Sequence, residues 1–303
     1  MKVAVFICGQ PKFFDPCLQS QLDFFRASGF VFDYFIHTWT NSSYIESPEQ
    51  KKSGQWLKNN LVYDKSELRK LIENSYKPKK LSITNISDNR IESDFLDLVK
   101  SSKDHKRNHK LSTYINSGNR DIKYFLDGWG TGQSFSIEKS SELCDFSKYD
   151  ACIKIRQDIF FDQHTEEEKS KFFNAVVSKD SLFLYKIFNE REVSDAVFAS
   201  RADVYSGLFG DIYKFHISSL DEVFKDVKGT QVSYKSFFGN EKPSFSTCLN
   251  LIAEKARKEK VKLVCRESGV TEYPRYSIFR DYHMSCWKKG FSAIKEQIRK
   301  EWS

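Results

Sequence analysis

Short apolar runs alternate with amphipathic segments along this chain, and this alternation most limits how it can fold. The run "KVAVFIC" (2–8) is β-branched and is followed at once by Gly9, which predicts a buried strand ending in a turn. Residues 16–28 have apolar side chains at helical spacing, and Asp15 is the expected N-cap. The run "FVFDYFIH" (30–37) predicts a second strand. A strand, helix and strand of this length suit a right-handed parallel crossover.

The same alternation continues to the end of the chain. Thr165 and Glu168 form an expected capping box at the start of one helix. Further strands are expected at 81–86, 149–162, 181–187, 193–200 and 261–266, and further helices at 65–76, 131–144, 166–177, 201–213, 243–260 and 292–302. Such a pattern predicts an α/β fold, with a mixed, mainly parallel sheet and helices on both faces.

Composition limits the class of protein. The 303 residues, 40% of them hydrophobic, suffice for a core, and we expect a single domain over 1–303. No apolar run approaches the roughly 20 residues of a membrane span, and the first residues do not resemble a signal peptide. Seven cysteines without CxxC or Cys/His spacing favour a reducing compartment over a disulfide or zinc framework. We therefore expect a cytoplasmic protein.

Positive charge is concentrated in one part of the chain. Residues 51–123 hold 17 Lys and Arg against 9 Asp and Glu, whereas the whole chain has a net charge of +7. We expect a basic insert at 40–120, mobile around 100–112, and a C-terminal helical and loop region at 240–303. The insert is either a solvated surface or a partner for anions such as nucleic acid, anionic lipid or phosphate. Because no nucleic-acid-binding signature accompanies it, we expect no nucleic acid partner, and peripheral membrane contact stays open.

Three expected strands end in polar or aromatic residues, at 9–12, 37–39 and 156–158. In α/β sheets, ligands bind at the carboxyl ends of strands, close to the point where the strand order reverses. These three strand ends are therefore expected to meet along one edge. The sequence lacks GxGxxG, Walker A, HExxH and GxSxG motifs, which disfavours dinucleotide-dependent oxidoreductases, P-loop NTPases and serine hydrolases.

Several segments resemble a known family. "FICGQPKFF", "FDYFIHTW", "GQSFSIEKSSELC", "YDACIKIRQDIFF" and "SDAVFAS" are similar to bacterial and viral proteins of surface-polysaccharide biosynthesis. Those proteins resemble glycosyltransferases of the Rossmann-like GT-A fold, and the resemblance covers roughly residues 1–40 and 131–205. It implies transfer of a sugar from a nucleotide-sugar donor to a glycan or lipid-linked acceptor. The alternative is a catalytically silent nucleotide-sugar or glycan-binding protein on the same fold.

The resemblance also implies where the donor diphosphate binds. In the GT-A pattern an Asp-x-Asp at the end of a strand holds a divalent metal against the diphosphate. This chain has Arg156-Gln157-Asp158 there. Asp158 with the diphosphate would still hold Mn²⁺ or Mg²⁺, which we favour, or Arg156 itself would be the cation. The remaining alternative is an Arg–Asp pair that only closes the end of a strand.

Other donor-side candidates follow the first two strands. Gly9 would let the backbone approach a nucleotide, Gln10 would contact a base or ribose, and Lys12 would contact a phosphate. The resemblance places His37 and Trp39 in the donor pocket, with Trp39 stacking on a base or sugar. An ordinary strand–helix turn and a structural histidine are the alternatives.

On the acceptor side, an inverting enzyme needs a base for the acceptor hydroxyl. Asp195 is the first candidate, and Glu241 and Asp203 are the second candidates. The late segment "PRYSIFRDYH" (274–283) either folds over the donor or forms a surface turn. Its candidate phosphate-neutralising residues are Arg275, Arg280 and His283.

Overall fold

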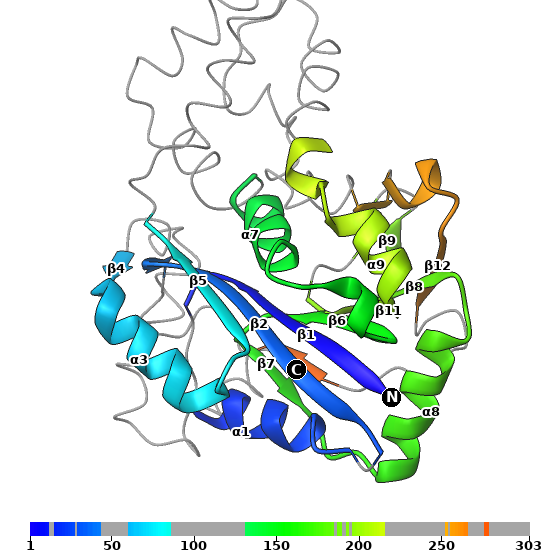
Figure 1. The fold of residues 1–303 in the computed structure, drawn as a ribbon, viewed down its shortest axis with the longest axis horizontal. Coiled ribbons are helices and arrows are strands. Elements are labelled where there is room, and N and C mark those ends of the chain that lie inside the picture. Colours follow the sequence, from blue (N-terminus) through cyan, green and yellow to red (C-terminus); the bar gives the residue numbers. More distant parts are fainter. Residues whose placement is uncertain are drawn as a thin grey trace, which may run out of the picture.

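A seven-stranded sheet lies at the centre of the protein in a computed structural model (Figure 1). The structure describes residues 1–11, 15–27, 29–43, 60–85, 131–184, 187–189, 192–193, 196–215, 252–253, 255–265 and 276–278. The central strands are β1 (Lys2–Gly9), β2 (Val31–Trp39), β5 (Lys80–Thr84), β6 (Ala151–Ile155), β8 (Ser181–Leu184), β11 (Phe198–Arg201) and β12 (Lys262–Cys265).

The strand order is β12-β8-β11-β6-β1-β2-β5, and only β11 runs against its two neighbours. The chain moves outward from β1 to β2 and β5, then returns to place β6 on the other side of β1. This 3-2-1-4 order is that of a Rossmann-like unit. The predicted α/β fold with a mixed, mainly parallel sheet is confirmed, and its architecture agrees with a GT-A-like arrangement.

Helices cover both faces of this sheet (Figure 1). On one face lie α1 (Asp15–Phe24), α3 (Lys65–Tyr76) and α8 (Glu166–Val177), and on the other lie α7 (Thr131–Ser141) and α9 (Ala202–Phe209). Side chains of a strand alternate between the two faces, so Val5 of β1 joins the core under α1, α3 and α8. Its neighbour Phe6 joins the second core, where its ring stacks on Tyr205 of α9 at 4.8 Å.

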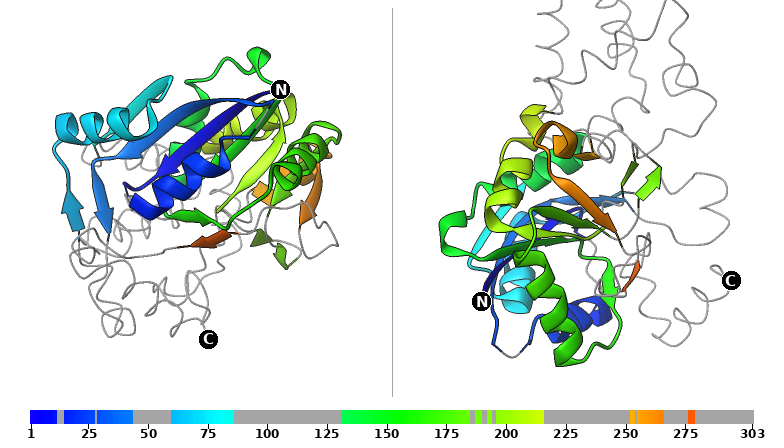
Figure 2. Two further views of the ribbon diagram at one scale, coloured as in Figure 1. Left: turned by 90° about the horizontal axis from the view of Figure 1, so that it is seen from below. Right: turned by 90° about the vertical axis from the view of Figure 1, so that its right-hand side faces the viewer.

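Shorter strand pairs extend the carboxyl side of the sheet. They are β3 (Asn41–Ser43) with β4 (Asn60–Val62), β7 (Ile159–Phe161) with β13 (Tyr276–Ile278), and β9 (Ile187–Asn189) with β10 (Glu192–Val193). A 3₁₀ helix, η4 (Phe146–Lys148), precedes β6. Figure 2 shows β13 beside β7, so a segment from late in the chain lies next to the strand that follows β6.

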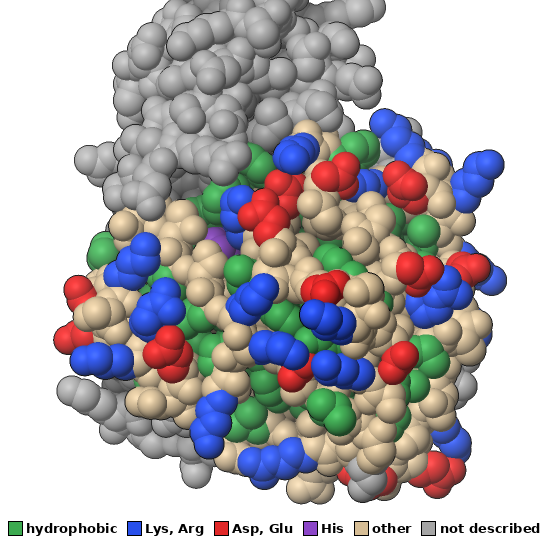
Figure 3. Space-filling view, in the orientation of Figure 1, with side chains coloured by type: hydrophobic (Ala, Val, Ile, Leu, Met, Phe, Trp, Pro, Cys, Tyr) green, Lys and Arg blue, Asp and Glu red, His purple; other side chains and the backbone are tan. Residues whose placement is uncertain are grey.

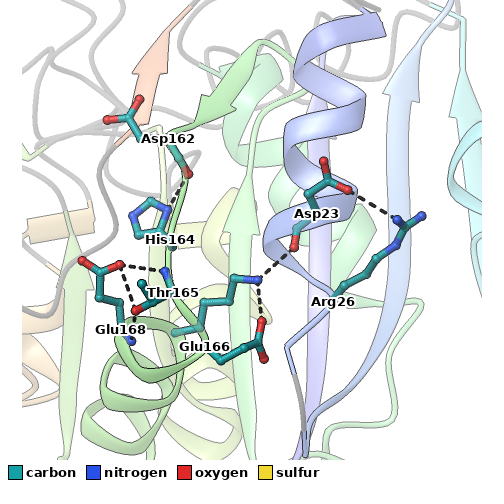
Figure 4. A network of polar contacts seen from close by, with 8 residues as sticks. Asp23, Arg26, Asp162, His164, Thr165, Glu166 and Glu168 are labelled. Atoms are coloured by element: carbon teal, nitrogen blue, oxygen red, sulfur yellow. Dashed lines mark hydrogen bonds and ion pairs between the residues drawn. The ribbon is translucent and has the colours of Figure 1, made fainter.

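A buried lysine of α8 forms hydrogen bonds that connect this helix to the C-terminal end of α1 (Figure 4). The ammonium of Lys169 donates to the backbone carbonyl of Asp23 at 3.1 Å and to the carboxylate of Glu166 at 3.0 Å. A cation at the C-terminal end of a helix is electrostatically favourable. Phe24 of α1 also stacks on Phe161 at 4.1 Å, so α1, β7 and α8 are held as one layer.

The structure changes two expected boundaries. Residues 60–85, which we placed in the basic insert, supply β5 to the central sheet and the core-facing side of α3. The expected strand 149–162 is two strands, β6 and β7, separated by a turn. Residues 44–59 and 86–120 of the expected insert, including the run expected to be mobile, and the expected helix 292–302 lie outside the described residues.

Charged side chains are mixed by sign on the face shown in Figure 3, where lysines and arginines alternate with acidic residues. No helix among the described residues is long and apolar enough to cross a bilayer.

The capping box at the start of α8 is confirmed. Thr165 Oγ1 accepts from the backbone N–H of Glu168 at 3.2 Å, and the Glu168 carboxylate accepts from the backbone N–H of Thr165 at 2.8 Å. Thr165→Ala removes one of these acceptors and should lower the free energy of unfolding by about 1 kcal/mol in urea denaturation. Asn174→Ala, an exposed change within the same helix, is the control. An equal loss in both variants would contradict a capping role.

Candidate functional site

Three strand ends lie side by side at one edge of the sheet. Strands β1 and β6 are parallel neighbours, with Ile7 opposite Ile155, and β2 is parallel to β1, with Thr38 opposite Gly9. The chain reverses its direction of growth between β1 and β6. The strand ends at Gly9 and Arg156 therefore lie at the switch point, where ligands bind in open α/β sheets.

Gly9 combines a backbone conformation that favours glycine with open space. Its φ is 123°, a conformation that side chains with a Cβ rarely adopt, and a Cβ built there meets no described atom within 4 Å. Its N–H donates to Ser136 Oγ at 2.9 Å, and its carbonyl accepts from Thr38 Oγ1 at 2.8 Å. The backbone of Gly9 is thus fixed while its Cα faces space that a ligand could enter. Gln10 follows it and is half-buried.

His37 is a buried structural residue in this arrangement. Its Nδ1 lies 2.7 Å from Ser136 Oγ and its Nε2 lies 3.0 Å from Thr84 Oγ1, with none of the residue exposed. Burial, and secondly the charge of Lys139, lower the pKa of His37 to about 3, so the imidazole is neutral. A neutral ring that accepts from Ser136 and donates to Thr84 satisfies both contacts.

Trp39 is also turned into the protein. Its side chain packs 5.2 Å from Phe135 of α7 and 5.4 Å from His37, measured between ring centroids, and the residue is 5% exposed. In this position it offers no open face to a base or sugar. His37 and Trp39 therefore join α7 to β2, and α7 in turn carries Ser136 to the backbone of Gly9.

Arg156 and Asp158 form a two-bonded ion pair at the end of β6. Arg156 Nε donates to Asp158 Oδ1 at 2.9 Å and Arg156 Nη2 donates to Asp158 Oδ2 at 2.5 Å. Strand alternation does not place them on one face, because β6 ends at Ile155 and residues 156–158 form a turn. The turn, closed by the N–H of Ile159 donating to the carbonyl of Arg156 at 3.4 Å, brings them together.

The pair has an inner and an outer member. The Asp158 side chain is 1% exposed, whereas that of Arg156 is 17% exposed. Burial, and secondly the charge of Asp158, raise the pKa of the Cys17 thiol, which places the carboxylate near the first turn of α1. The guanidinium is the member of the pair that a ligand at the edge can reach.

Gln21 was missed by the sequence reasoning. It lies on α1, fully buried, and its Nε2 donates to the carbonyls of Gln157 and Ile159 at 3.1 and 2.7 Å. The available signal was its position: Gln21 stands four residues after Cys17 and three before Phe24, on the core-facing side of the helix. A polar residue there must find buried partners.

The metal expected at Asp158 does not fit the described residues. Both carboxylate oxygens of Asp158 already accept from Arg156, whose positive charge opposes a second cation. Within the described part of the chain, no group of three or more His, Cys, Asp or Glu side chains could hold a metal ion.

Asp203, a second candidate for the base, lies at the wrong edge of the sheet. Strand β11 is antiparallel to β6, with Arg201 opposite Ala151, so the residues after β11 lie at the amino edge. Asp203 there accepts from Arg201. The other expected residues outside the description are Lys12, Asp195, Glu241, Arg275, Arg280 and His283.

Comparisons with known proteins give one similar structure to report. No protein-family model and no curated protein matches the sequence. The crystal structure of mouse xyloside xylosyltransferase 1, apo form, matches at 7% identity and a TM-score of 0.36, over 88% of this chain and 85% of that one. At this TM-score the match carries no weight for fold or function.

The buried neutral His37 should make stability depend on pH. Because its folded pKa of about 3 lies below the ordinary value of 6.5, its contribution is present above pH 6.5 and is lost as the pH falls. From about pH 8 to about pH 5 this loss is about 2 kcal/mol. Urea denaturation of wild type and His37→Gln at both pH values measures it, with a flatter dependence expected in the variant. Equal slopes would show that His37 is not buried as the neutral imidazole.

Proposed function

We propose that this protein is a nucleotide-sugar-dependent glycosyltransferase that transfers a sugar to a hydroxyl of a glycan or lipid-linked acceptor. One observation carries the proposal: β1 and β6 are parallel neighbours at the switch point, so Gly9 and Arg156 end at the same edge. The sequence motifs at these two strand ends are the ones that resemble the GT-A glycosyltransferases.

On the donor side, Gly9 allows close approach of the nucleotide, because the space beside its Cα holds no described atom within 4 Å. Gln10 contacts the base or ribose, and Lys12 contacts a phosphate. His37 and Trp39 leave the set of contact residues, since both are buried against α7. In this proposal they hold α7 against β2, and Ser136 of α7 in turn binds the backbone of Gly9.

Arg156 supplies the positive charge for the diphosphate. Negative charge grows on the leaving diphosphate as the glycosidic bond to the donor breaks, so a fixed cation lowers the barrier. Asp158 binds the Nε and Nη2 donors and thereby holds the guanidinium plane. Guanidinium groups bind phosphate oxygens through paired N–H donors. The reaction is therefore proposed to need no metal ion at Asp158.

Asp195 is proposed as the base that takes the proton from the acceptor hydroxyl. It precedes Ala196 and the strand β11, and β11 begins at the carboxyl edge because Phe198 pairs with Lys154 of antiparallel β6. The start of β11 is thus on the same edge as Gly9 and Arg156.

Peripheral membrane contact through the basic segment stays a prediction.

A catalytically silent binding protein is the second candidate, and the Arg156–Asp158 pair is the observation that favours it. The pair occupies the only acidic position that remains of the expected metal motif. Slow hydrolysis of a nucleotide sugar without acceptor distinguishes the two, because a binding protein would not break the donor bond.

Nucleoside diphosphates and nucleotide sugars should raise the melting temperature of the wild type in a screen with excess EDTA. A ligand at a hundred times its dissociation constant adds about 2.7 kcal/mol of stability. Arg156→Lys keeps the charge but loses the paired donors, and should weaken diphosphate binding by roughly tenfold or more. Stabilisation that requires added Mn²⁺ would contradict the metal-free site.

The control for this variant is Arg201→Lys. Arg201 and Asp203 repeat the Arg-x-Asp contact, with Nε donating to Oδ1 at 2.9 Å, but they lie at the amino edge and are more exposed. Equal effects of the two substitutions would place the diphosphate elsewhere.

Asp195→Asn should lower turnover by about a hundredfold or more with little change in diphosphate affinity, because a missing base affects proton transfer only. Steady-state kinetics with an acceptor and calorimetric titration of diphosphate measure the two quantities. Asp180→Asn, an exposed change before β8, is the matched control. Loss of diphosphate binding with turnover preserved would show that the assigned role is wrong.

A further inference from the structure

We propose that Gln21 is a positioning residue that sets the direction of Arg156 at the diphosphate site. The claim rests on the proposed function for its ligand, although the geometry stands without it. Gln21 touches no ligand position itself. It acts through the backbone of the turn that carries Arg156 and Asp158.

The amide of Gln21 lies inside that turn. Its Nε2 is 3.3 Å from the carbonyl oxygen of Arg156, 3.1 Å from that of Gln157 and 2.7 Å from that of Ile159. Two N–H groups therefore serve three carbonyls on the two sides of Asp158. Any rotation of the turn would break at least one of these bonds in a site from which water is excluded.

Tyr76 at the end of α3 fixes which way the amide points. Its hydroxyl donates to Gln21 Oε1 at 2.9 Å, in the same buried layer. Burial, followed by the charges of Cys17 and Tyr34, raises the pKa of Tyr76 well above its ordinary value, so the hydroxyl keeps its proton. With its oxygen held by a donor, the NH₂ group of Gln21 must face the turn.

Helix α1 also connects the two halves of the site. It follows Gly9 in the sequence, and it binds the other side of the turn through Ser20, whose hydroxyl accepts from the N–H of Phe161 at 3.1 Å. Helix α1 is thus connected to the end of β1 through the chain and to the turn after β6 through hydrogen bonds. A shift of α1 would change the spacing between Gly9 and Arg156.

A role limited to core stability makes a different prediction from a positioning role. Loss of core stability would lower the melting temperature and act independently of Arg156. A positioning role acts only through Arg156, so the effects of the two substitutions on ligand affinity should not add.

The test uses Gln21→Met, which keeps the length of the side chain and removes the amide. Titration with ADP, CDP, GDP and UDP should show roughly tenfold weaker binding of the preferred diphosphate, and no further loss when Gln21→Met is added to Arg156→Lys. Gln19→Met is the matched control, since Gln19 is exposed on the same helix and bonds only Asp23 among the contacts described. Additive losses, or an unchanged affinity in folded Gln21→Met, would overturn the proposal.

A second measurement needs no ligand. The Arg156 Nε–H bond to Asp158 should give a slowly exchanging ¹⁵N signal in wild type and Gln19→Met, and a faster-exchanging one in Gln21→Met. If Gln21→Met does not fold, Tyr76→Phe replaces it in this measurement, because it removes only the hydroxyl that holds the Gln21 amide. Should no diphosphate bind the wild type, the proposed function fails, while this signal still decides the role of Gln21. An unchanged signal in the folded variant would refute it.

Discussion

The parallel pairing of β1 with β6 is the constraint on which the arrangement of this protein depends. In the chain, β2 and β5 are completed on one side of β1 before β6 pairs with its other side. The connections after β1 and β6 then lead in opposite directions along the sheet. Their carboxyl ends are left as neighbours with no strand between them. The position of the candidate site is a consequence of this path, before any side chain is considered.

The chain contains two Arg-x-Asp ion pairs that differ in their burial and in their place in the sheet. Arg156 with Asp158 and Arg201 with Asp203 have the same spacing and the same Nε–Oδ1 distance of 2.9 Å. The second pair is solvated at the amino edge, where such pairs contribute little. In the first, a carboxylate that is 1% exposed depends on its guanidinium, because an unpaired charge there would be costly. Burial and location, rather than the motif, make the first pair a candidate site.

Local signals and the meeting of three strand ends at one edge were predictable from the sequence, whereas the pairing of β5 and the direction of β11 were not. The helices at 65–76 and 166–177 have the expected bounds, since caps at Asp64 and Thr165 fix their starts within a few residues. Within the expected insert, 60–85 supplies β5 to the sheet, and its pairing with β2 had no local signal because it depends on distant residues. The antiparallel direction of β11 also carried no local signal. It places Asp203, a second candidate for the base, at the amino edge.

Several buried polar residues at the candidate site bind backbone groups and each other rather than face a ligand. The sequence leaves two interpretations of His37, a donor-pocket residue or a structural histidine, and the structure shows it buried and bonded to Ser136. Ser136 in turn accepts from Gly9, and Gln21 binds the turn after β6. A strand end has backbone groups that the sheet no longer pairs, and they need partners when buried. Inward-facing polar residues supply those partners on both sides of the switch point. The partly exposed side chain of Arg156 and the open side of Gly9 can then face a ligand, because the buried polar groups next to them already have hydrogen-bond partners.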